Sequence, residues 1–200
     1  MSGYFEKEHK RLISAFEGGW SDHPSDRGGR TIYGISKIQN PSWAGWELVE
    51  VVLVKCAAQN LPKAATRAAL EADERIKELA RLFYRQHYWD LVLGDSLAAV
   101  SQDVAGEVFE QSVNLGVYRA CKNLQVVLNI MNRDYLIVPD IREDGKIGVE
   151  TVSRLQRYAV TNDIPNVLKL LNHQQSRTYI DMASSDKTQR MFIRGWLTRT

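Results

Sequence analysis

The sequence predicts a mainly α-helical protein, because apolar residues recur at helical spacing and clusters of turn-forming residues separate the helical segments. In residues 4–17, five side chains fall on one helical face: Phe5, His9, Leu12, Ile13 and Phe16. In residues 164–182 the same spacing is kept by Ile164, Val167, Leu168 and Leu171. The 200-residue chain shows no internal repeat, so we expect a helical fold with one or two cores.

The remaining elements follow in chain order. Gly18 and Gly19 are expected to end the first helix, and residues 20–31, rich in Ser, Asp, Pro and Gly, predict an ordered loop. Three helices are expected within residues 47–92. Later helices are expected over residues 103–115, closed by Gly116, and over 118–131, 149–160, 164–182 and 187–198. The polar break DYLIVPDIREDGKIG, residues 134–148, predicts a small hairpin or an irregular loop.

Composition narrows the possible partners. The net charge of +2 is too small for a strong nucleic-acid footprint, so no nucleic acid is expected to bind. The most apolar run, LVEVVLVKCAA, contains Glu50 and Lys55 and is too short to span a bilayer. The first residues lack the pattern of a secretory signal, so we expect synthesis in the cytoplasm and action in the periplasm or cell wall after release.

Cysteine and histidine usage gives no sign of a metal site or another cofactor. Cys56 and Cys121 are far apart and lack a CxxC pattern, so both are expected to be small buried hydrophobic residues. The four histidines are scattered along the chain. Five glutamates with charged or solvated neighbours are expected on helix surfaces: Glu6, Glu8, Glu71, Glu74 and Glu78.

The segment FEGGWSDHPSDRGGRTIYGI, residues 16–35, has the residue types of a glycosidase site. Glu17 stands at the end of a helix beside the apolar Phe16 and Trp20. The negative end of the helix dipole and desolvation would both raise its carboxyl pKa, as a general acid requires. Asp26 could supply the second carboxylate of glycoside hydrolysis, and the Thr31 hydroxyl could orient a water. The alternative is a solvated helix end followed by a turn aspartate.

These residues resemble the signature of glycoside hydrolase family 108, a family of bacterial and phage muramidases. The matching residues are Glu17-Gly18-Gly19-Trp20, Asp26, Gly28-Gly29, Thr31 and Tyr33-Gly34-Ile35. Further segments resemble family motifs in the same order: YRQHYWDLVLGDSL, FEQSVNLG, the peptidoglycan-binding DGKIGVETVSRL and FIRGWLTR. Departures from the family pattern include Trp20 for tyrosine, His23 for an acid, Arg27 for proline and Glu110 for aspartate.

The resemblance implies a lysozyme-like helical fold, with a catalytic lobe over residues 1–93 and a helical peptidoglycan-binding lobe over residues 94–200. It implies hydrolysis of the β-1,4 bond between N-acetylmuramic acid and N-acetylglucosamine without a cofactor, with Glu17 as the acid. Asp26 and Thr31 are carried over from a looser similarity to phage-type lysozymes, in which such residues hold the attacking water. Substrate-binding candidates are Gly18, Trp20, Tyr33, Tyr88, Trp89, Gln111 and Asn114.

Two other functions remain open at this stage. A lytic transglycosylase would cut the same bond with one glutamate and leave Asp26 and Thr31 idle. A non-catalytic module would bind peptidoglycan or recruit secretion components, with Glu17 structural only. The expected partners are peptidoglycan glycan strands and, for release, a holin or a secretion apparatus, which suits either a phage endolysin or a bacterial secretion muramidase.

Overall fold

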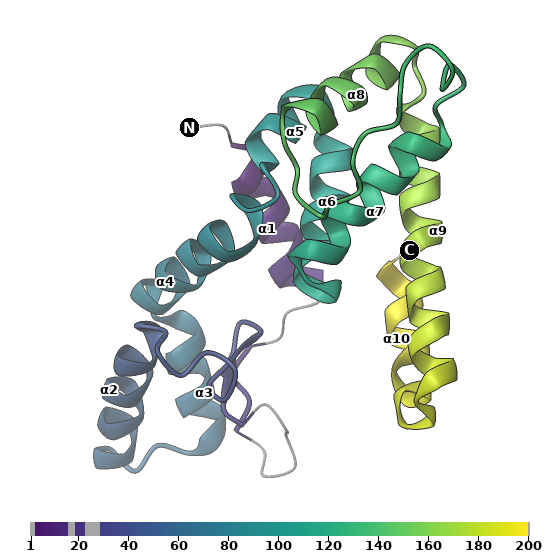
Figure 1. Ribbon diagram of the computed structural model, residues 1–200. Coiled ribbons are helices and arrows are strands. Elements are labelled where there is room, and N and C mark those ends of the chain that lie inside the picture. The colour runs from purple at the N-terminus through teal and green to yellow at the C-terminus, as the bar shows by residue number, and fades with distance from the viewer. Residues whose placement is uncertain (1–2, 16–18, 23–28, 200) are drawn as a thin grey trace. The chain divides into compact units, whose positions relative to one another are not determined.

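The computed structural model describes residues 3–15, 19–22 and 29–199, and most of them are helical (Figure 1). The mainly α-helical class expected from the sequence is confirmed. The chain divides into two compact units. The N-terminal unit comprises Phe5–His87, and the C-terminal unit comprises Tyr88–Thr200 together with the residues before Phe5.

The N-terminal unit contains helices α1 to α4 and a small hairpin. The elements are α1 (Tyr4–Ala15), β1 (Thr31–Ile32), β2 (Ile35–Ser36), α2 (Gly45–Ala58), α3 (Lys63–Ala72), α4 (Glu74–Tyr84) and the π-helical turn η1 (Arg85–Trp89). Helix α2 packs on both α3 and α4. The three helices expected within residues 47–92 are therefore confirmed. Asp73 separates α3 from α4, because its carboxylate accepts hydrogen bonds from the N–H groups of Arg75 and Ile76 and so caps α4.

The hairpin lies at residues 31–36, where the sequence did not indicate one. Ile32 pairs with Ile35 across a two-residue turn, and both turn residues have positive φ: 49° at Tyr33 and 74° at Gly34. Two successive positive φ values are typical of the type I′ turn, whose twist matches that of the strands it joins. Strands of two residues are too short to show an alternating pattern, which explains why the sequence did not reveal them.

The C-terminal unit is a cluster of helices around α6. Its elements are α5 (Gly94–Val100), α6 (Gln102–Leu115), α7 (Val117–Ile130), α8 (Val149–Val160), α9 (Ile164–Ser185), η2 (Lys187–Phe192), α10 (Ile193–Trp196) and η3 (Leu197–Arg199). Helix α6 packs on α5, α7 and α9. Gly116, with a φ of 89°, ends α6 as expected. The single helix expected over residues 187–198 is replaced by short 3-10 and α-helical turns, in which Trp196 stacks on Tyr179.

The segment between α7 and α8 forms an irregular loop and not a hairpin (Figure 1). Three amide side chains bind this loop, two from α7 and one from the start of the loop itself. Gln125 donates to Lys146 O and accepts from Gly145 N, and Asn129 exchanges two hydrogen bonds with the backbone of Ile141. Asn132 donates to Val138 O. These side chains satisfy the loop backbone as a neighbouring strand would, so no strand pairing is required.

Both cysteines are buried and free, as expected from the sequence. Burial raises the pKa of the Cys121 thiol to about 11. Four of the five glutamates expected at helix surfaces divide into two groups, and the fifth, Glu71, is partly buried. Glu6, Glu74 and Glu78 form exposed ion pairs, but the expectation was wrong for Glu8, which is buried beside Arg11 at 2.8 Å. In the part of the chain that the structure describes, no helix is long and apolar enough to cross a membrane.

Candidate functional site

The candidate site belongs to the segment that follows α1 in the N-terminal unit. Glu17, Gly18 and Asp26 lie outside the described residues, and the structure describes the backbone on either side of them. Ser21 and Thr31 form an antiparallel bridge, with Ser21 N donating to Thr31 O at 2.8 Å and Thr31 N donating to Ser21 O at 2.9 Å. This bridge joins the two ends of the loop that carries Asp26.

Glu71 of α3 anchors the described backbone that comes directly after Glu17 and Gly18. Its Oε1 atom accepts hydrogen bonds from Trp20 N at 2.9 Å and from Arg67 Nε at 2.7 Å. A Cβ atom on Gly19 would lie 1.7 Å from that same oxygen. A side chain at Gly19 would therefore displace the Glu71 carboxylate from its hydrogen bond with Trp20 N.

Glu71 was expected to be a surface glutamate, and the structure corrects this. Its side chain is only 31% exposed because the carboxylate is shared between Arg67 and the Trp20 backbone. Partial burial acts to raise the pKa of this carboxyl, but the hydrogen bonds from Arg67 and from Trp20 N outweigh it. The pKa of Glu71 therefore lies below its ordinary value, and the anchor is charged near neutral pH.

Tyr33 fastens the hairpin to α3 and α4. Its hydroxyl donates to Glu71 O at 2.8 Å, and Tyr84 donates its own hydroxyl to Tyr33 O at 2.8 Å. Burial, together with the negative charge of Glu71, raises the pKa of Tyr33 to about 12. These two bonds hold a non-glycine residue at positive φ, so they account for Tyr33 as a structural residue. Its predicted contact with substrate stays a prediction.

Ion pairs connect both sides of the loop to α2. Arg30 lies 2.8 Å from Glu50 and 3.4 Å from Asp22, and Lys37 lies 2.7 Å from the same Glu50 oxygen as Arg30. The hydrogen bond from Lys37 and the charge of Arg30 hold the pKa of Glu50 below its ordinary value. Exposed pairs of this kind add little stability individually, but they fix Arg30 beside the Ser21–Thr31 bridge.

A hollow of about 520 Å³ borders this anchored backbone within the N-terminal unit. It is lined by Trp20, Asp22, Leu53, Leu61, Lys63, Ala64, Thr66 and Arg67. The half-buried Trp20 offers an aromatic surface of the kind that packs on the apolar face of a sugar ring. Lys63 adds a positive charge beside it, while the charge of Arg67 is shared with Glu71, so the hollow can receive a carbohydrate that carries carboxylates.

Thr31 lies at the end of the bridged loop, in β1. It is partly exposed, and its hydroxyl donates to Gly29 O at 3.3 Å. A hydroxyl that donates one hydrogen bond still has lone pairs with which to accept another. Thr31 can therefore accept a hydrogen bond from a water, as its predicted role requires.

The remaining predicted site residues belong to the C-terminal unit, and packing explains several of them. Trp89 is fully buried and donates Nε1 to Asp95 at 3.1 Å. Gln111 is fully buried and donates to Leu171 O at 3.1 Å and to Glu107 at 2.9 Å, while Asn114 donates to the Tyr179 hydroxyl. Through these bonds the segment FEQSVNLG joins α6 to α9. Tyr88 is half-buried at the end of η1. Direct contact of these four residues with a glycan stays a prediction.

Glu71, Lys63 and Arg67 are the site residues that sequence reasoning missed. The Arg67–Glu71 spacing of four residues was visible in the sequence, but on a helix it usually marks a solvent-exposed pair. The decisive contact joins Glu71 to Trp20, 51 residues earlier in the chain. Among the described residues, no group of three or more His, Cys, Asp or Glu side chains is placed to hold a metal ion.

Comparison with known proteins assigns both parts of the chain. The family model described as glycosyl hydrolase 108 matches residues 11–116, and the model described as a predicted peptidoglycan domain matches residues 119–200. The family models thus meet near residue 117, whereas the compact units meet after His87. The lobe boundary expected between residues 93 and 94 stays a prediction.

Solved structures agree with this assignment. A structure titled "Structure of Brucella abortus SagA" is similar over 98% of this chain and 89% of its own, with a TM-score of 0.57 and 25% sequence identity. No curated protein matches the chain significantly. The family suspected from the sequence motifs is confirmed, and the two matches make the protein a glycoside hydrolase that acts on peptidoglycan. The chain belongs to the glycosyl hydrolase 108 family.

Proposed function

We propose that this protein is an N-acetylmuramidase, which hydrolyses the β-1,4 bond between N-acetylmuramic acid and N-acetylglucosamine. The proposal rests on the hollow that Trp20 borders. Trp20 follows the predicted acid Glu17 by three residues, and its backbone is anchored by Glu71. A sugar in this hollow would lie next to the segment that supplies the acid. The family match supports the same chemistry.

The charges of the hollow favour a muramyl substrate over an uncharged glycan. Lys63 and Arg67 line it, and Asp22 is the acidic residue among the described lining residues. Peptide-bearing muramic acid carries carboxylates, whereas a strand of N-acetylglucosamine alone carries none. The ring of Trp20 would pack on the sugar face while Lys63 attracts the substrate carboxylates.

In the proposed reaction, Glu17 donates its proton to the glycosidic oxygen as the bond to the muramic acid carbon breaks. A water held by Asp26 and Thr31 attacks that carbon from the opposite face, and Asp26 takes up the proton that the water loses. Gly18 would let the sugar approach the backbone closely. The Ser21–Thr31 bridge supports this arrangement, since it fixes Thr31 at the end of the loop that carries Asp26.

Mass spectrometry of the fragments released from purified peptidoglycan tests the proposal. Hydrolysis by a muramidase yields fragments that end in a reducing N-acetylmuramic acid. A lytic transglycosylase would release anhydromuramic ends, a glucosaminidase would release reducing N-acetylglucosamine ends, and a non-catalytic binding module would release no fragments. Any of these three results would refute the proposed bond or chemistry.

The water-holding pair has its own test. An inverting displacement releases the new reducing end first as the α-anomer, which proton NMR of a fresh digest detects. Asp26→Asn and Thr31→Val should each lower kcat while the substrate still binds. An initial β-anomer would instead show retention, and Asp26 would then act as a nucleophile or would take no part.

The proposal also concerns where the protein acts. Its substrate lies outside the cytoplasmic membrane, so a protein made in the cytoplasm would need a holin pore or a secretion apparatus to reach it. The match to a peptidoglycan domain supports action at the cell wall. Fractionation of expressing cells with and without a holin tests the first route, since the holin should move the protein from the cytoplasmic fraction to the wall fraction.

A further inference from the structure

Two hollows on the C-terminal unit share a pair of arginines from α8. The larger, of about 410 Å³, lies between residues 131–134 and the C-terminal half of α8, and the smaller, of about 320 Å³, lies between residues 138–141 and the same helix. Arg154 and Arg157 line both hollows. The two guanidinium-bearing side chains therefore form the wall between two adjacent depressions.

Arg154 has unused hydrogen-bonding capacity at this wall. Its side chain is buried, with 6% of the residue exposed, and its Nη2 atom donates to Pro139 O at 2.7 Å. Its Nη1 atom is shielded from solvent and has no hydrogen-bond partner among the described residues. Folded proteins rarely leave a buried charged donor unsatisfied, and such a group points to an oxygen supplied from outside the chain.

Arg157, one turn further along α8, adds a second guanidinium with a weak partner. Its charged neighbour is Asp134, at 3.9 Å, and both side chains are more than half exposed. Arg133 also lines the larger hollow and forms no ion pair in the described part of the chain. The second acid there, Asp163, already accepts hydrogen bonds from Thr161 at the end of α8 and from Asn166 in α9. Three arginines and two acids line the larger hollow, and the smaller hollow adds Asp140, which accepts a hydrogen bond from Asn132, and Glu150.

We propose that Arg154 and Arg157 bind a carboxylate of the peptidoglycan stem peptide; this inference rests on the proposed function. Guanidinium groups form paired, charge-assisted hydrogen bonds with carboxylates. The stem peptide presents several carboxylates along an extended chain. The hollows on either side of the pair would receive the residues before and after the bound carboxylate. The C-terminal unit then recognises the peptide, while the N-terminal unit cleaves the glycan.

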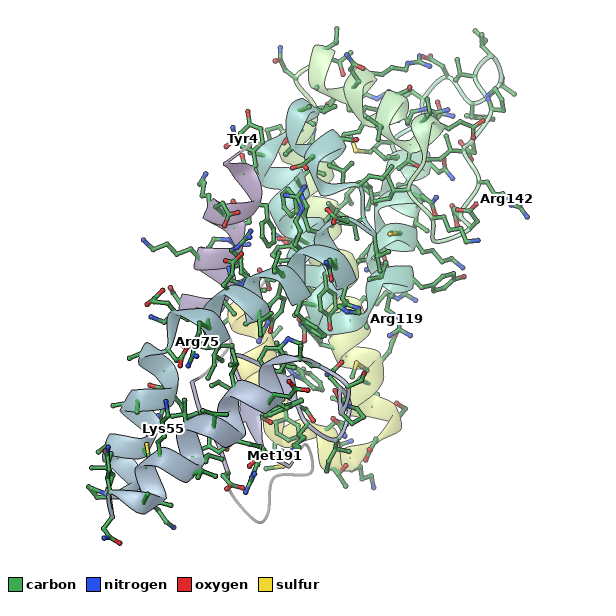
Figure 2. All side chains as sticks on the ribbon, turned by 90° about the vertical axis from the view of Figure 1, so that its left-hand side faces the viewer. Tyr4, Lys55, Arg75, Arg119, Arg142 and Met191 are labelled. Atoms are coloured by element: carbon green, nitrogen blue, oxygen red, sulfur yellow. The ribbon has the colours of Figure 1, made fainter. Side chains whose placement is uncertain are left out.

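Calorimetric titration of the full-length protein with a synthetic stem tripeptide tests the proposal. The free acid should bind, and the same peptide with its carboxyls amidated should bind at least about tenfold more weakly. Arg157→Gln should weaken binding of the free acid about tenfold. Arg154→Lys keeps the charge but loses the planar fork, and it should also weaken binding. The exposed Arg119 (Figure 2) is the matched control, because it lines neither hollow. Arg119→Gln should leave the affinity unchanged.

Several results would overturn the proposal. These are no binding of the free acid, equal binding of the amidated peptide, or unchanged affinity in a folded Arg157→Gln variant. Displacement of the peptide by an equal concentration of inorganic phosphate would also overturn it, since a general anion site would explain that result. Hydrolysis of purified peptidoglycan by the wild-type protein is measured separately. Hydrolysis without tripeptide binding refutes this inference alone, and tripeptide binding without hydrolysis refutes the proposed function.

Discussion

Two loops, one in each unit, are held against helices by side chains, and they are held by different chemistry. In the N-terminal unit, the backbone after Glu17 is anchored by one carboxylate, Glu71, which Arg67 keeps charged. In the C-terminal unit, the loop between α7 and α8 is bound by neutral amides, among them Gln125 and Asn129. The amides take the place of strand pairing in the second loop, whereas the first loop also has the Ser21–Thr31 bridge.

The difference predicts how each loop responds to mutation and to acid. Because the hydrogen bond between Trp20 N and Glu71 anchors the backbone after Glu17, a small change at Gly19 or Glu71 should disturb the whole motif segment. Several amide side chains bind the other loop, so the loss of one should lower the free energy of unfolding without affecting catalysis. A carboxylate titrates between neutral and acidic pH, whereas an amide does not.

The largest effect is expected from Gly19→Ala. The new methyl group would meet the Glu71 carboxylate oxygen, so this oxygen would have to leave Trp20 N. Misplacement of catalytic groups by about 1 Å can lower a rate on the order of 100-fold, and we expect a fall of that size in peptidoglycan hydrolysis. Gly3→Ala is the matched control, since no atom lies within 4 Å of its added carbon. Wild-type activity in Gly19→Ala would show that the Glu71 contact does not position the motif.

An intermediate effect is expected from Asn129→Ala. The change removes two hydrogen bonds with the Ile141 backbone and one with Glu143. Leaving a backbone group without its partner costs about 1–3 kcal/mol, so the free energy of unfolding should fall by roughly that amount. Urea denaturation measures it, with the exposed Arg119→Ala on the same helix as control. Hydrolysis of soluble glycan chains should change much less than in Gly19→Ala; an equal loss would refute the contrast between the loops.

The smallest expected effect is a dependence of stability on pH that arises from the Glu71 carboxylate. The pKa of Glu71 is lower in the folded protein than in the unfolded chain. Its charge therefore stabilises the fold at neutral pH, and this stabilisation is lost as the pH falls through the folded pKa. Glu71→Gln keeps an acceptor for Trp20 N but cannot titrate there. The difference in melting temperature between wild type and Glu71→Gln should shrink as the pH falls from about 7 to about 3, given ordinary carboxyl pKa values. A constant difference would contradict the charged anchor.

The sequence was informative where helical spacing and local motifs decide the structure. The helix expected over residues 149–160 matches α8, and the family motifs were recognised from their order. It was uninformative where a long-range contact decides the role of a residue. Glu71 looked like a surface glutamate because nothing within α3 indicates Trp20 as its partner.

Burial was the second quantity that local reasoning could not supply. Trp89 and Gln111 have side chains suited to binding sugars, and their position in the C-terminal core depends on how α6 packs on its neighbours. The amide side chains at and just after the end of α7 were visible in the sequence. Their role became clear only with the course of the loop that they bind.

The most direct test of the central claim is Glu17→Gln, which removes the proposed proton donor while preserving its shape. Release of soluble fragments from purified peptidoglycan should fall by roughly 10²–10⁴-fold, the range that general acid catalysis contributes. The melting temperature and the binding to insoluble peptidoglycan should stay near those of the wild type. Near wild-type release by a folded Glu17→Gln protein would contradict the assignment of Glu17 as the catalytic acid.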